Sequence, residues 1–210
     1  MTTADRAWVV AVTGGIAAGQ TAVTRRFQAL GVPVHDADQA ARAVVAAGSA
    51  GLAEIVEHFG PEVLDAAGEL DRPAMRARIF DKPAARIELE AIVHPLIRRW
   101  LQDKVRLQHQ PYAMLAIPLL AEHLAAYDWL QRVLVIDIDP MLQKQRLLRR
   151  DGIDIELAER IIASQSSAAA RLAIADDIIC NNGSESALDD QIATLHQHYL
   201  RLAGDYAVDG

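Results

Sequence analysis

Five short apolar runs recur along the chain, and longer stretches of helical periodicity separate them. The runs cover residues 8–12, 32–35, 112–117, 132–137 and 177–180. Nearly continuous apolar runs of this length are typical of strands that are buried on both faces of a parallel sheet. Since strands alternate with helices, the pattern predicts an α/β domain with an open parallel sheet. Residues 1–7, which precede the first strand, are expected to fray.

A long helical block, residues 39–110, separates the second predicted strand from the third. Within it, Asp71 and Pro73 predict the start of a helix. Three apolar residues of that helix are expected to face inward: Met75, Ile79 and Phe80. Pro95 should kink or break the helical stretch 84–110. Because the block is too long for a simple crossover between parallel strands, it predicts an inserted lid or substrate subdomain.

The C-terminal part of the chain contains the fifth strand and a final helix, residues 185–203. Five residues at helical spacing are expected to bury one face of this helix: Leu188, Ile192, Leu195, Tyr199 and Leu202. Cys180, in the fifth strand, is expected to be a core residue. As the single cysteine of the chain, it also excludes an internal disulfide.

Length, composition and charge narrow the class of protein. A chain of 210 residues with 51% hydrophobic residues suits one α/β domain that carries an inserted subdomain. The net charge of −7 argues against a general basic surface for nucleic acid, although it allows a local basic cluster for phosphates. Since no apolar run is long enough for a bilayer and no targeting segment is recognisable, a cytoplasmic location without membrane attachment is expected.

A glycine-rich turn, residues 13–21, joins the first strand to a helix. The helix carries apolar residues at helical spacing: Val23, Phe27 and Leu30. Gly14, four further residues, Gly19 and Thr21 match the Walker A pattern, except that Gln20 stands at the lysine position. The glycines let successive backbone N–H groups turn toward one anion, and the helix directs its positive end to the same point.

The turn therefore predicts a phosphate-binding loop, in which the hydroxyl of Thr21 is placed to bind Mg²⁺. The alternative is a plain strand–turn–helix corner without a ligand. The loop reading is favoured because the turn has both the buried strand before it and the helix after it that the motif requires.

Acidic residues follow three of the predicted strands, at the edge where open parallel sheets bind ligands. Asp36 and Asp38 end the second strand, so they are expected at the same edge as the glycine-rich turn. Asp38 is suited to accept a proton from a substrate hydroxyl, and Asp36 to hold Mg²⁺ through water. The alternative for Asp38 is helix capping. Glu122 either contacts a ligand or stabilises a first helical turn, and Asp137 is a weak Walker B match.

Arginines are concentrated after the fourth strand. Arg146 and Arg150 are four residues apart and share a helix face, which suits them to phosphoryl oxygens. The alternative is a solvated face on which Asp151 is the partner. Together with Arg171, this pair makes residues 146–171 a predicted mobile lid of the kind that closes over ATP.

Three further features are compatible with ligand binding. The loop after the fifth strand, Asn181–Gly183, offers amide groups that could read a base. His94, beside Pro95, either touches a substrate or is structural. Arg72, Arg76 and Arg78 concentrate positive charge in the helical block, whereas the seven histidines show no spacing that indicates a metal site.

Seven segments, taken in order, resemble the dephospho-coenzyme A kinase family over about residues 8–203. They are Thr13–Gly19, Asp36–Asp38, His94–Pro95, Pro118–Glu122, the Arg146 and Arg150 pair, Ala170–Asp177 and Asn181–Gly183. The set is far more specific than any one member. The resemblance implies a P-loop NTPase-type fold with three layers and a five-stranded parallel sheet. It also implies a helical coenzyme-A-binding insertion at about 39–110 and a lid at about 146–171.

The resemblance further implies that the γ-phosphate of ATP passes to the ribose 3′-hydroxyl of dephospho-coenzyme A, the last step of coenzyme A synthesis. Asp38 would be the base, and Arg146 and Arg150 would be catalytic lid arginines. Residues implied to hold ATP are Gly14, Gly15, Ile16, Ala17, Ala18, Gly19, Gln20, Thr21, Ala22, Asn181 and Asn182, with Mg²⁺ on Thr21. Residues implied to contact the acceptor are Asp36, Arg76, His94, Pro118, Leu119, Glu122 and Arg171. A monomer or small homo-oligomer is expected.

Gln20 is the departure from the family pattern, because it keeps a hydrogen-bond donor and loses the lysine charge. A hydrogen bond to a charged group contributes roughly 1.5–3 kcal/mol, so its loss implies transfer on the order of 10–100-fold slower. A catalytically weakened relative that only binds nucleotide or coenzyme A is therefore the alternative. A small-metabolite or nucleoside kinase shares the loop, but the segments at His94–Pro95 and Pro118–Glu122 disfavour it.

Overall fold

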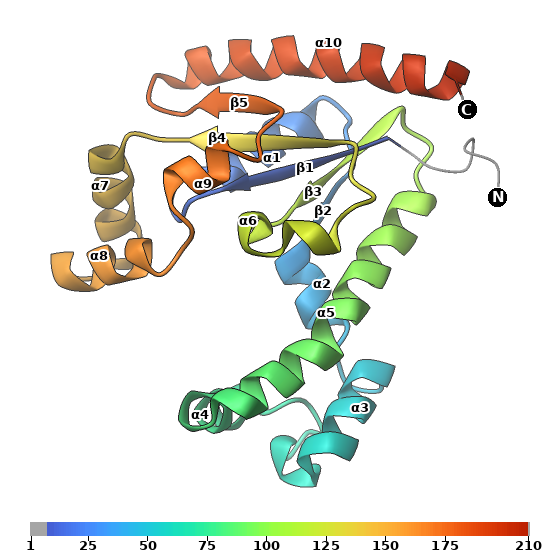
Figure 1. Cartoon of the computed structure of the whole chain (residues 1–210), viewed down its shortest axis with the longest axis vertical. Helices are drawn as coiled ribbons and strands as arrows, with labels where there is room; N and C mark the ends of the chain where they lie inside the picture. The colour runs from blue at the N-terminus through green and yellow to red at the C-terminus, as the bar shows by residue number, and fades with distance from the viewer. Residues whose placement is uncertain (1–7, 210) are drawn as a thin grey trace. The chain divides into compact units, whose positions relative to one another are not determined.

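The computed structural model describes residues 8–209, so residues 1–7, which are expected to fray, lie outside the described part. Five strands form a parallel sheet in the order β2-β3-β1-β4-β5 (Figure 1). They are β1 (Trp8–Gly14), β2 (Val34–Asp36), β3 (Tyr112–Ala116), β4 (Arg132–Asp137) and β5 (Asp177–Cys180). Helices alternate with these strands along the chain, which confirms the predicted α/β class.

The chain divides into two compact units. Of the described residues, those up to His35 and those from Val105 onward form the sheet unit, and Asp36–Lys104 form the helical unit. The sequence places a helical insertion at about 39–110, which overlaps the second unit. Among the described residues, no helix combines the length and the apolar composition that crossing a bilayer requires.

β1 is the central strand, and all seven of its residues are buried. It pairs in parallel with β3, where Trp8 lies opposite Tyr112, and with β4, where Gly14 lies opposite Ile136. A strand with a neighbour on each side and apolar packing on both faces can be apolar throughout. Its burial fixes the start of the glycine-rich loop at the centre of the sheet.

Helices α1 (Gln20–Ala29) and α10 (Glu185–Asp209) pack together in the main core of the sheet unit. Phe27 stacks on Tyr199 there, with ring centroids 6.2 Å apart. The Tyr199 hydroxyl donates to Asp177 at 3.0 Å, and Arg132 Nε donates to the same carboxylate at 2.5 Å. These bonds tie α10 to the start of both β4 and β5.

The segment between β4 and β5 folds into three helices that begin at side-chain caps. They are α7 (Pro140–Asp151), α8 (Ile155–Ala163) and α9 (Ala168–Leu172). Asp139, Asp154 and Ser167 accept hydrogen bonds from the first-turn N–H groups of these helices. Figure 1 shows α7 and α8 extending past the end of β4 at which the chain leaves the strand. A short helix, α6 (Leu120–His123), follows β3.

The helical unit has a core of its own. Its helices are α2 (Ala37–Ala43), α3 (Ala50–Phe59), α4 (Arg72–Asp81) and α5 (Pro83–Arg106), the last of which continues into the sheet unit. The core contains Val45, Ile55, Phe59, Val63, Met75 and Ala85. As predicted, Asp71 caps α4 and Pro73 lies in its first turn. A break at Pro95 is not found, because α5 is one helix of 24 residues that contains this proline.

Two side chains, Phe80 and Cys180, lie outside the core in which they were expected, and the apolar Leu30 is exposed as well. Phe80 is 86% exposed, since it follows the buried Met75 by five residues and is thus rotated about 140° from that face of α4. Cys180 is exposed because alternate residues of a strand face opposite sides, and Ile179 takes the buried position. Leu30 is 46% exposed because α1 ends one residue earlier.

Candidate active site

The glycine-rich loop joins β1 to α1 as predicted, and two of its residues have left-handed backbone conformations. Gly19, the N-cap of α1, has a φ of 101°, which a Cβ atom disfavours. Ala17 has a φ of 59°, which is uncommon for a residue other than glycine. A hydrogen bond from the Ala18 N–H to the Gly15 carbonyl, 3.0 Å long, closes the turn between them. Since no side chain caps α1 at Gly19, the first N–H groups of this helix remain for an anionic ligand.

Gln20 turns back toward the sheet. Its Nε2 donates to the Val12 carbonyl at 2.6 Å, so the amide ties the first residue of α1 to the end of β1. Thr13 anchors the other side of the loop, because its Oγ1 donates to the Pro118 carbonyl at 3.2 Å. The loop is therefore fixed to β1 and to the segment that follows β3.

Thr21 is the residue of the loop that could hold Mg²⁺. It lies in the first turn of α1 and is exposed. Mg²⁺ prefers oxygen ligands and usually keeps waters and substrate phosphates beside one or two protein ligands, so a single hydroxyl fits it. The described part of the chain contains no group of three or more His, Cys, Asp or Glu side chains suited to a metal ion.

The two asparagines after β5 both contact backbone groups of other elements. Asn181 is 7% exposed, and its Nδ2 donates to the Ala18 carbonyl at 2.7 Å. Asn182 Oδ1 accepts from the Asp139 N–H at 2.7 Å. The first bond holds the glycine-rich loop, and the second holds the start of α7. Their predicted position near adenine stays a prediction.

Two glutamines bind both backbone groups of Ile16. Gln143, on α7, donates from Nε2 to the Ile16 carbonyl at 2.8 Å. Gln165, between α8 and α9, accepts from the Ile16 N–H through Oε1, also at 2.8 Å. Gln143 is only 5% exposed, so this amide lies in the interior of the protein. We call this pair of contacts the amide clamp.

Arg171, on α9, lies against the same part of the loop. A Cβ atom on Gly15 would come within 2.8 Å of its Nη2, and its Nη1 donates to the Ser166 carbonyl. The Ser166 N–H in turn donates to Glu122 Oε1 at 2.9 Å. Partial burial lowers the pKa of Arg171, while Glu122 and Asp137 act to raise it. The guanidinium nevertheless keeps its charge at neutral pH.

Glu122 is ionised in this arrangement. Partial burial acts to raise its pKa, but hydrogen bonds from Ser166 and from its own backbone outweigh that effect, so its pKa is below its usual value. The carboxylate thus faces Arg171 through Ser166 and supplies negative charge beside the loop. Its predicted contact with the acceptor stays a prediction.

The two arginines of α7 have different surroundings. Arg146 approaches the loop, since its Nη1 would lie 3.9 Å from a Cβ atom on Gly19. Arg150 pairs with the adjacent Asp151, with Nε 2.6 Å from Oδ1, and its side chain is 55% exposed. The sequence left open the alternative that Asp151 is the partner on a solvated helix face, and for Arg150 the structure shows this pair. The structure therefore brings Arg146 to the loop, and it places Arg150 at the end of α7.

The acidic pair of the helical unit lies at the start of α2. Asp36, not Asp38, is the N-cap, because its side chain accepts from the Asp38 N–H at 2.7 Å and from the Gln39 N–H at 3.2 Å. Asp38 lies in the first turn and is exposed. Partial desolvation and the neighbouring Asp36 raise its pKa, and Arg42 opposes them. Asp38 is therefore free of the capping role and is a stronger base than an ordinary aspartate.

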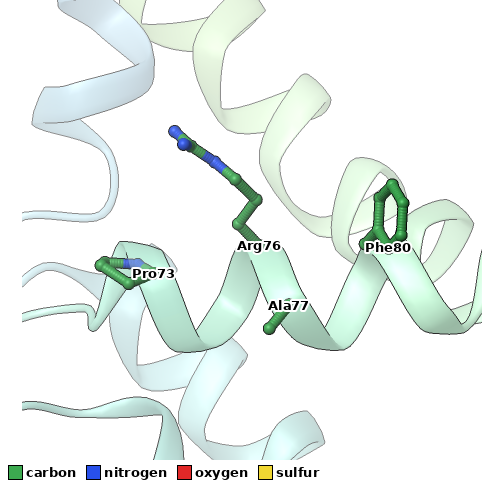
Figure 2. Close-up of a pocket in the computed structure, with 4 residues that line it drawn as sticks. All are labelled: Pro73, Arg76, Ala77 and Phe80. Atoms are coloured by element: carbon green, nitrogen blue, oxygen red, sulfur yellow. The ribbon is translucent and has the colours of Figure 1, made fainter.

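The helical unit also carries a surface pocket on α4. Its volume is about 460 Å³, and it is lined by Pro73, Arg76, Ala77 and Phe80. Figure 2 shows the side chains of Arg76 and Phe80 projecting from the same side of the helix. The pocket combines a guanidinium group with an exposed aromatic ring, which suits a ligand that has both anionic and apolar parts.

The remaining residues that the sequence predicts to contact the acceptor substrate belong to both units. His94 is half-buried within α5 of the helical unit. In the sheet unit, Pro118 binds Thr13 through its carbonyl, and Leu119 is 45% exposed at the start of α6. Their contact with an acceptor stays a prediction, as do the contacts of Asp36 and Arg76.

Sequence reasoning missed the amide clamp. Gln143 carries a signal that could have found it, because it shares a helix face with Leu147, four residues later, which is fully buried. A glutamine on the buried stripe of a helix needs a hydrogen-bond partner in the interior. Gln165 has no comparable signal, since it lies in a polar connection between two short helices.

Comparisons with known proteins agree on one family. The sequence profile of the dephospho-CoA kinase family matches residues 8–187. The dephospho-CoA kinase of Xanthomonas oryzae pv. oryzae is 51% identical, over 95% of this chain and 96% of its own length. That of Sodalis glossinidius is 47% identical, over 93% and 94%. Among solved structures, a dephospho-CoA kinase from Campylobacter jejuni superposes with a TM-score of 0.64 at 25% identity and covers 91% of this chain and 96% of that one.

The matched region contains the whole glycine-rich loop, both arginines of α7 and the asparagines after β5. The sheet order and the strand–loop–helix start at Gly19 are those of a P-loop kinase. The chain belongs to the dephospho-CoA kinase family.

Proposed function

We propose that this chain transfers the γ-phosphoryl group of ATP to the ribose 3′-hydroxyl of dephospho-coenzyme A, giving coenzyme A and ADP. The observation that carries the proposal is the loop at Gly19, with Arg146 and Arg171 beside it. In the transfer, the acceptor oxygen bonds to the γ-phosphorus as the bond to the β–γ bridging oxygen breaks. The reaction is the last step of coenzyme A biosynthesis, and we place it in the cytoplasm.

The loop and the arginines would hold the donor. In this proposal residues 14–22 bind the phosphates through backbone N–H groups other than those of Ile16 and Ala18, which donate to Gln165 and Gly15. Asn181 and Asn182 lie near adenine in the same proposal. Arg146 neutralises charge that moves onto the leaving group, and Arg150 joins it after exchanging Asp151 for a phosphoryl oxygen. Mg²⁺ bound at Thr21 would neutralise the β- and γ-oxygens.

Asp38 would act as the general base. A base in this position accepts the proton of the 3′-hydroxyl as the acceptor oxygen attacks, and such a group contributes about 10²–10⁴-fold to the rate. The raised pKa of Asp38 supports the role, because a stronger base has a greater affinity for that proton. Asp36 supports it indirectly, since it takes over the capping of α2.

The acceptor would extend along the helical unit. We assign its diphosphate to Arg76 and its apolar arm to Phe80, the two unlike side chains of the α4 pocket. His94, Pro118, Leu119, Glu122, Arg171 and Asp36 complete the proposed acceptor contacts. The proposal involves neither nucleic acid nor a membrane.

Gln20 supports a second candidate, a weakened relative that binds nucleotide or coenzyme A without efficient transfer. The bond from Gln20 to Val12 favours it, because the amide is engaged with the sheet and carries no charge. Asp38, Thr21 and Arg146 favour the kinase, since a protein that only binds has no chemical need of a base.

A coupled assay of ADP release, with and without dephospho-coenzyme A, separates the candidates. The kinase predicts ADP release that depends on the acceptor, whereas the binding protein predicts none. Calorimetric titration with ATP, Mg²⁺ and a nonhydrolysable analogue tests the loop itself. Absence of binding at millimolar nucleotide would contradict the kinase and would leave only a relative that binds coenzyme A.

A further inference from the structure

We propose that Gln143 and Gln165 are positioning residues that hold the two peptide groups on either side of the Ile16 Cα in the phosphate-binding loop. Gln143 sets the direction of the Ile16–Ala17 peptide, and through it the Ala17 N–H, while Gln165 fixes the preceding Gly15–Ile16 peptide. This inference rests on the proposed function for its kinetic consequences. Its structural part, the hold on the two peptide groups that meet at Ile16, is tested separately from activity.

The argument begins with the turn that contains this peptide. The Ala18 N–H donates to the Gly15 carbonyl at 3.0 Å, so the Ile16–Ala17 peptide is the middle one of a four-residue turn. Turn types I and II differ mainly by rotation of that middle peptide. Ala17, with a φ of 59°, occupies a conformation that alanine rarely adopts. Surrounding contacts must therefore select this rotation over its alternative.

The amide clamp supplies those contacts. Gln143 Nε2 holds the Ile16 carbonyl at 2.8 Å, and Gln165 Oε1 holds the Ile16 N–H at 2.8 Å. In a planar trans peptide the carbonyl and the next N–H point in opposite directions. Because Gln143 fixes the Ile16 carbonyl toward α7, the Ala17 N–H must point away from α7. Rotation of the middle peptide would break the bond to Gln143.

The clamp also connects the loop to the predicted lid. Gln143 lies three residues before Arg146 on α7, and Gln165 lies six residues before Arg171. A Cβ atom on Gly15 would approach Gln143 Nε2 to 2.6 Å and Arg171 Nη2 to 2.8 Å. Gln143, which lies just before the predicted lid segment 146–171, and Arg171, the last residue of that segment, therefore both lie against Gly15. Movement of α7, which carries Gln143, would change the direction of the Ala17 N–H.

The two glutamines have opposite hydrogen-bonding roles, which gives a sharp test. Gln143→Glu replaces a donor with a carboxylate that faces a carbonyl oxygen, so the bond is lost. Gln165→Glu keeps an acceptor for the Ile16 N–H, so the bond is retained. Both substitutions add one negative charge next to the same residue, so the difference between them reports on the hydrogen bond. Gln145→Glu, on the exposed face of α7, is the control for charge on this helix.

Steady-state kinetics should show that Gln143→Glu lowers kcat about tenfold more than Gln165→Glu does, which is the scale expected when one hydrogen bond is lost. The KM for dephospho-coenzyme A should not change, because neither glutamine is proposed to touch the acceptor. Gln143→Met, which keeps the side-chain length without the donor, should resemble Gln143→Glu and guards against unfolding by a buried charge. Equal loss of kcat in Gln143→Glu, Gln165→Glu and Gln145→Glu would overturn the proposal.

Hydrogen exchange provides a measurement that does not need activity. By nuclear magnetic resonance, the Ile16 amide should exchange slowly in the parental protein and in Gln165→Glu, and at least tenfold faster in Gln165→Met. Equal exchange rates in the three proteins would overturn the assignment of Gln165. A parental protein without kinase activity but with this exchange pattern would contradict the proposed function and leave the clamp supported.

Discussion

The phosphate-binding loop and the Asp36–Asp38 corner are both short strand-to-helix connections, but they are held in different ways. The loop is held by Gln143, Gln165 and Asn181, whose partners in the loop lie 127, 149 and 163 residues away in sequence. The hydrogen bonds that Asp36 accepts span two and three residues. One site is thus assembled by the folded sheet unit, and the other is built from neighbouring residues.

This difference indicates where each site should be sensitive. A loop that carries left-handed Ala17 needs distant partners, because its own sequence does not favour that conformation. A capped helix start forms from local interactions and leaves Asp38 exposed. Substitutions at the loop are therefore expected to change both folding and transfer. At the corner, substitution of Asp38 should change transfer alone, because Asp36 keeps the cap.

The largest expected effect tests the corner. Asp38→Asn should lower phosphoryl transfer at least 100-fold, because the amide keeps the shape and loses the basicity. Calorimetry should find ATP affinity and thermal stability nearly unchanged, since Asp36 remains the cap. Asp36→Asn is the matched control, because asparagine also caps helices. An Asp38→Asn variant that keeps more than about a tenth of parental turnover would rule out a general base at this position.

The next effect tests the loop. Gln20→Lys should raise kcat on the order of 10–100-fold, because the ammonium would meet the β- and γ-oxygens where charge moves in transfer. It should also lower the free energy of unfolding by about 1 kcal/mol, since the bond from Gln20 to Val12 is lost. Kinetics at saturating Mg²⁺ and chemical denaturation measure the two changes.

Gln20→Met is the control for this substitution, because it removes the same bond without adding charge. It should lose stability and gain no rate. If the lysine variant is no faster than the parent, another cation such as Arg146 or Arg171 already fills the role of the lysine, or the protein is not a kinase.

A smaller effect is expected at the pocket on α4. Phe80→Ala should raise the KM for dephospho-coenzyme A about tenfold. A change of this size corresponds to the binding free energy gained when a ligand buries part of one aromatic ring. The KM for ATP should not change. Ile87→Ala is the matched control, because Ile87 is an exposed apolar residue of the same unit outside the pocket. Equal KM values for the acceptor in both variants would place its apolar arm elsewhere.

The smallest expected effect is a displacement of the pH profile. A base must be deprotonated, so activity should fall as the pH decreases through the pKa of Asp38, which lies above its ordinary value. Asp36→Asn removes a like charge, so the acidic limb should move to lower pH. Arg42→Gln removes an opposing charge, so the limb should move to higher pH. Displacement of both variants in the same direction would show that another group controls this limb.

The sequence predicted what depends on neighbouring residues. The strand before the glycine-rich loop and the helix start at Asp71 were both confirmed. Local patterns predicted less where two neighbouring residues could each cap the same helix. The cap of α2 is Asp36, and Asp38 lies inside the helix. Phe80 shows that an apolar residue close in sequence to a buried face can still be rotated away from it.

The distant hydrogen bonds that hold the loop could not be predicted from neighbouring residues. The hydrogen bond that Gln165 accepts and the one that Asn181 donates depend on which distant segments meet the loop after the sheet has formed. A pattern of apolar and polar positions contains no such information. The chemistry of the loop is therefore readable from nine consecutive residues, whereas its rigidity is a property of the whole sheet unit.

Gly15 has a consequence for anyone who transplants this loop into a designed protein. Its φ is outside the left-handed region, so the backbone alone would accept alanine there. It is glycine because the Gln143 amide and the Arg171 guanidinium occupy the space of a side chain. A grafted loop without those two partners would tolerate larger residues at this position. The direction of its Ile16–Ala17 peptide would no longer be fixed. The portable unit is the loop together with its contacts from α7 and α9.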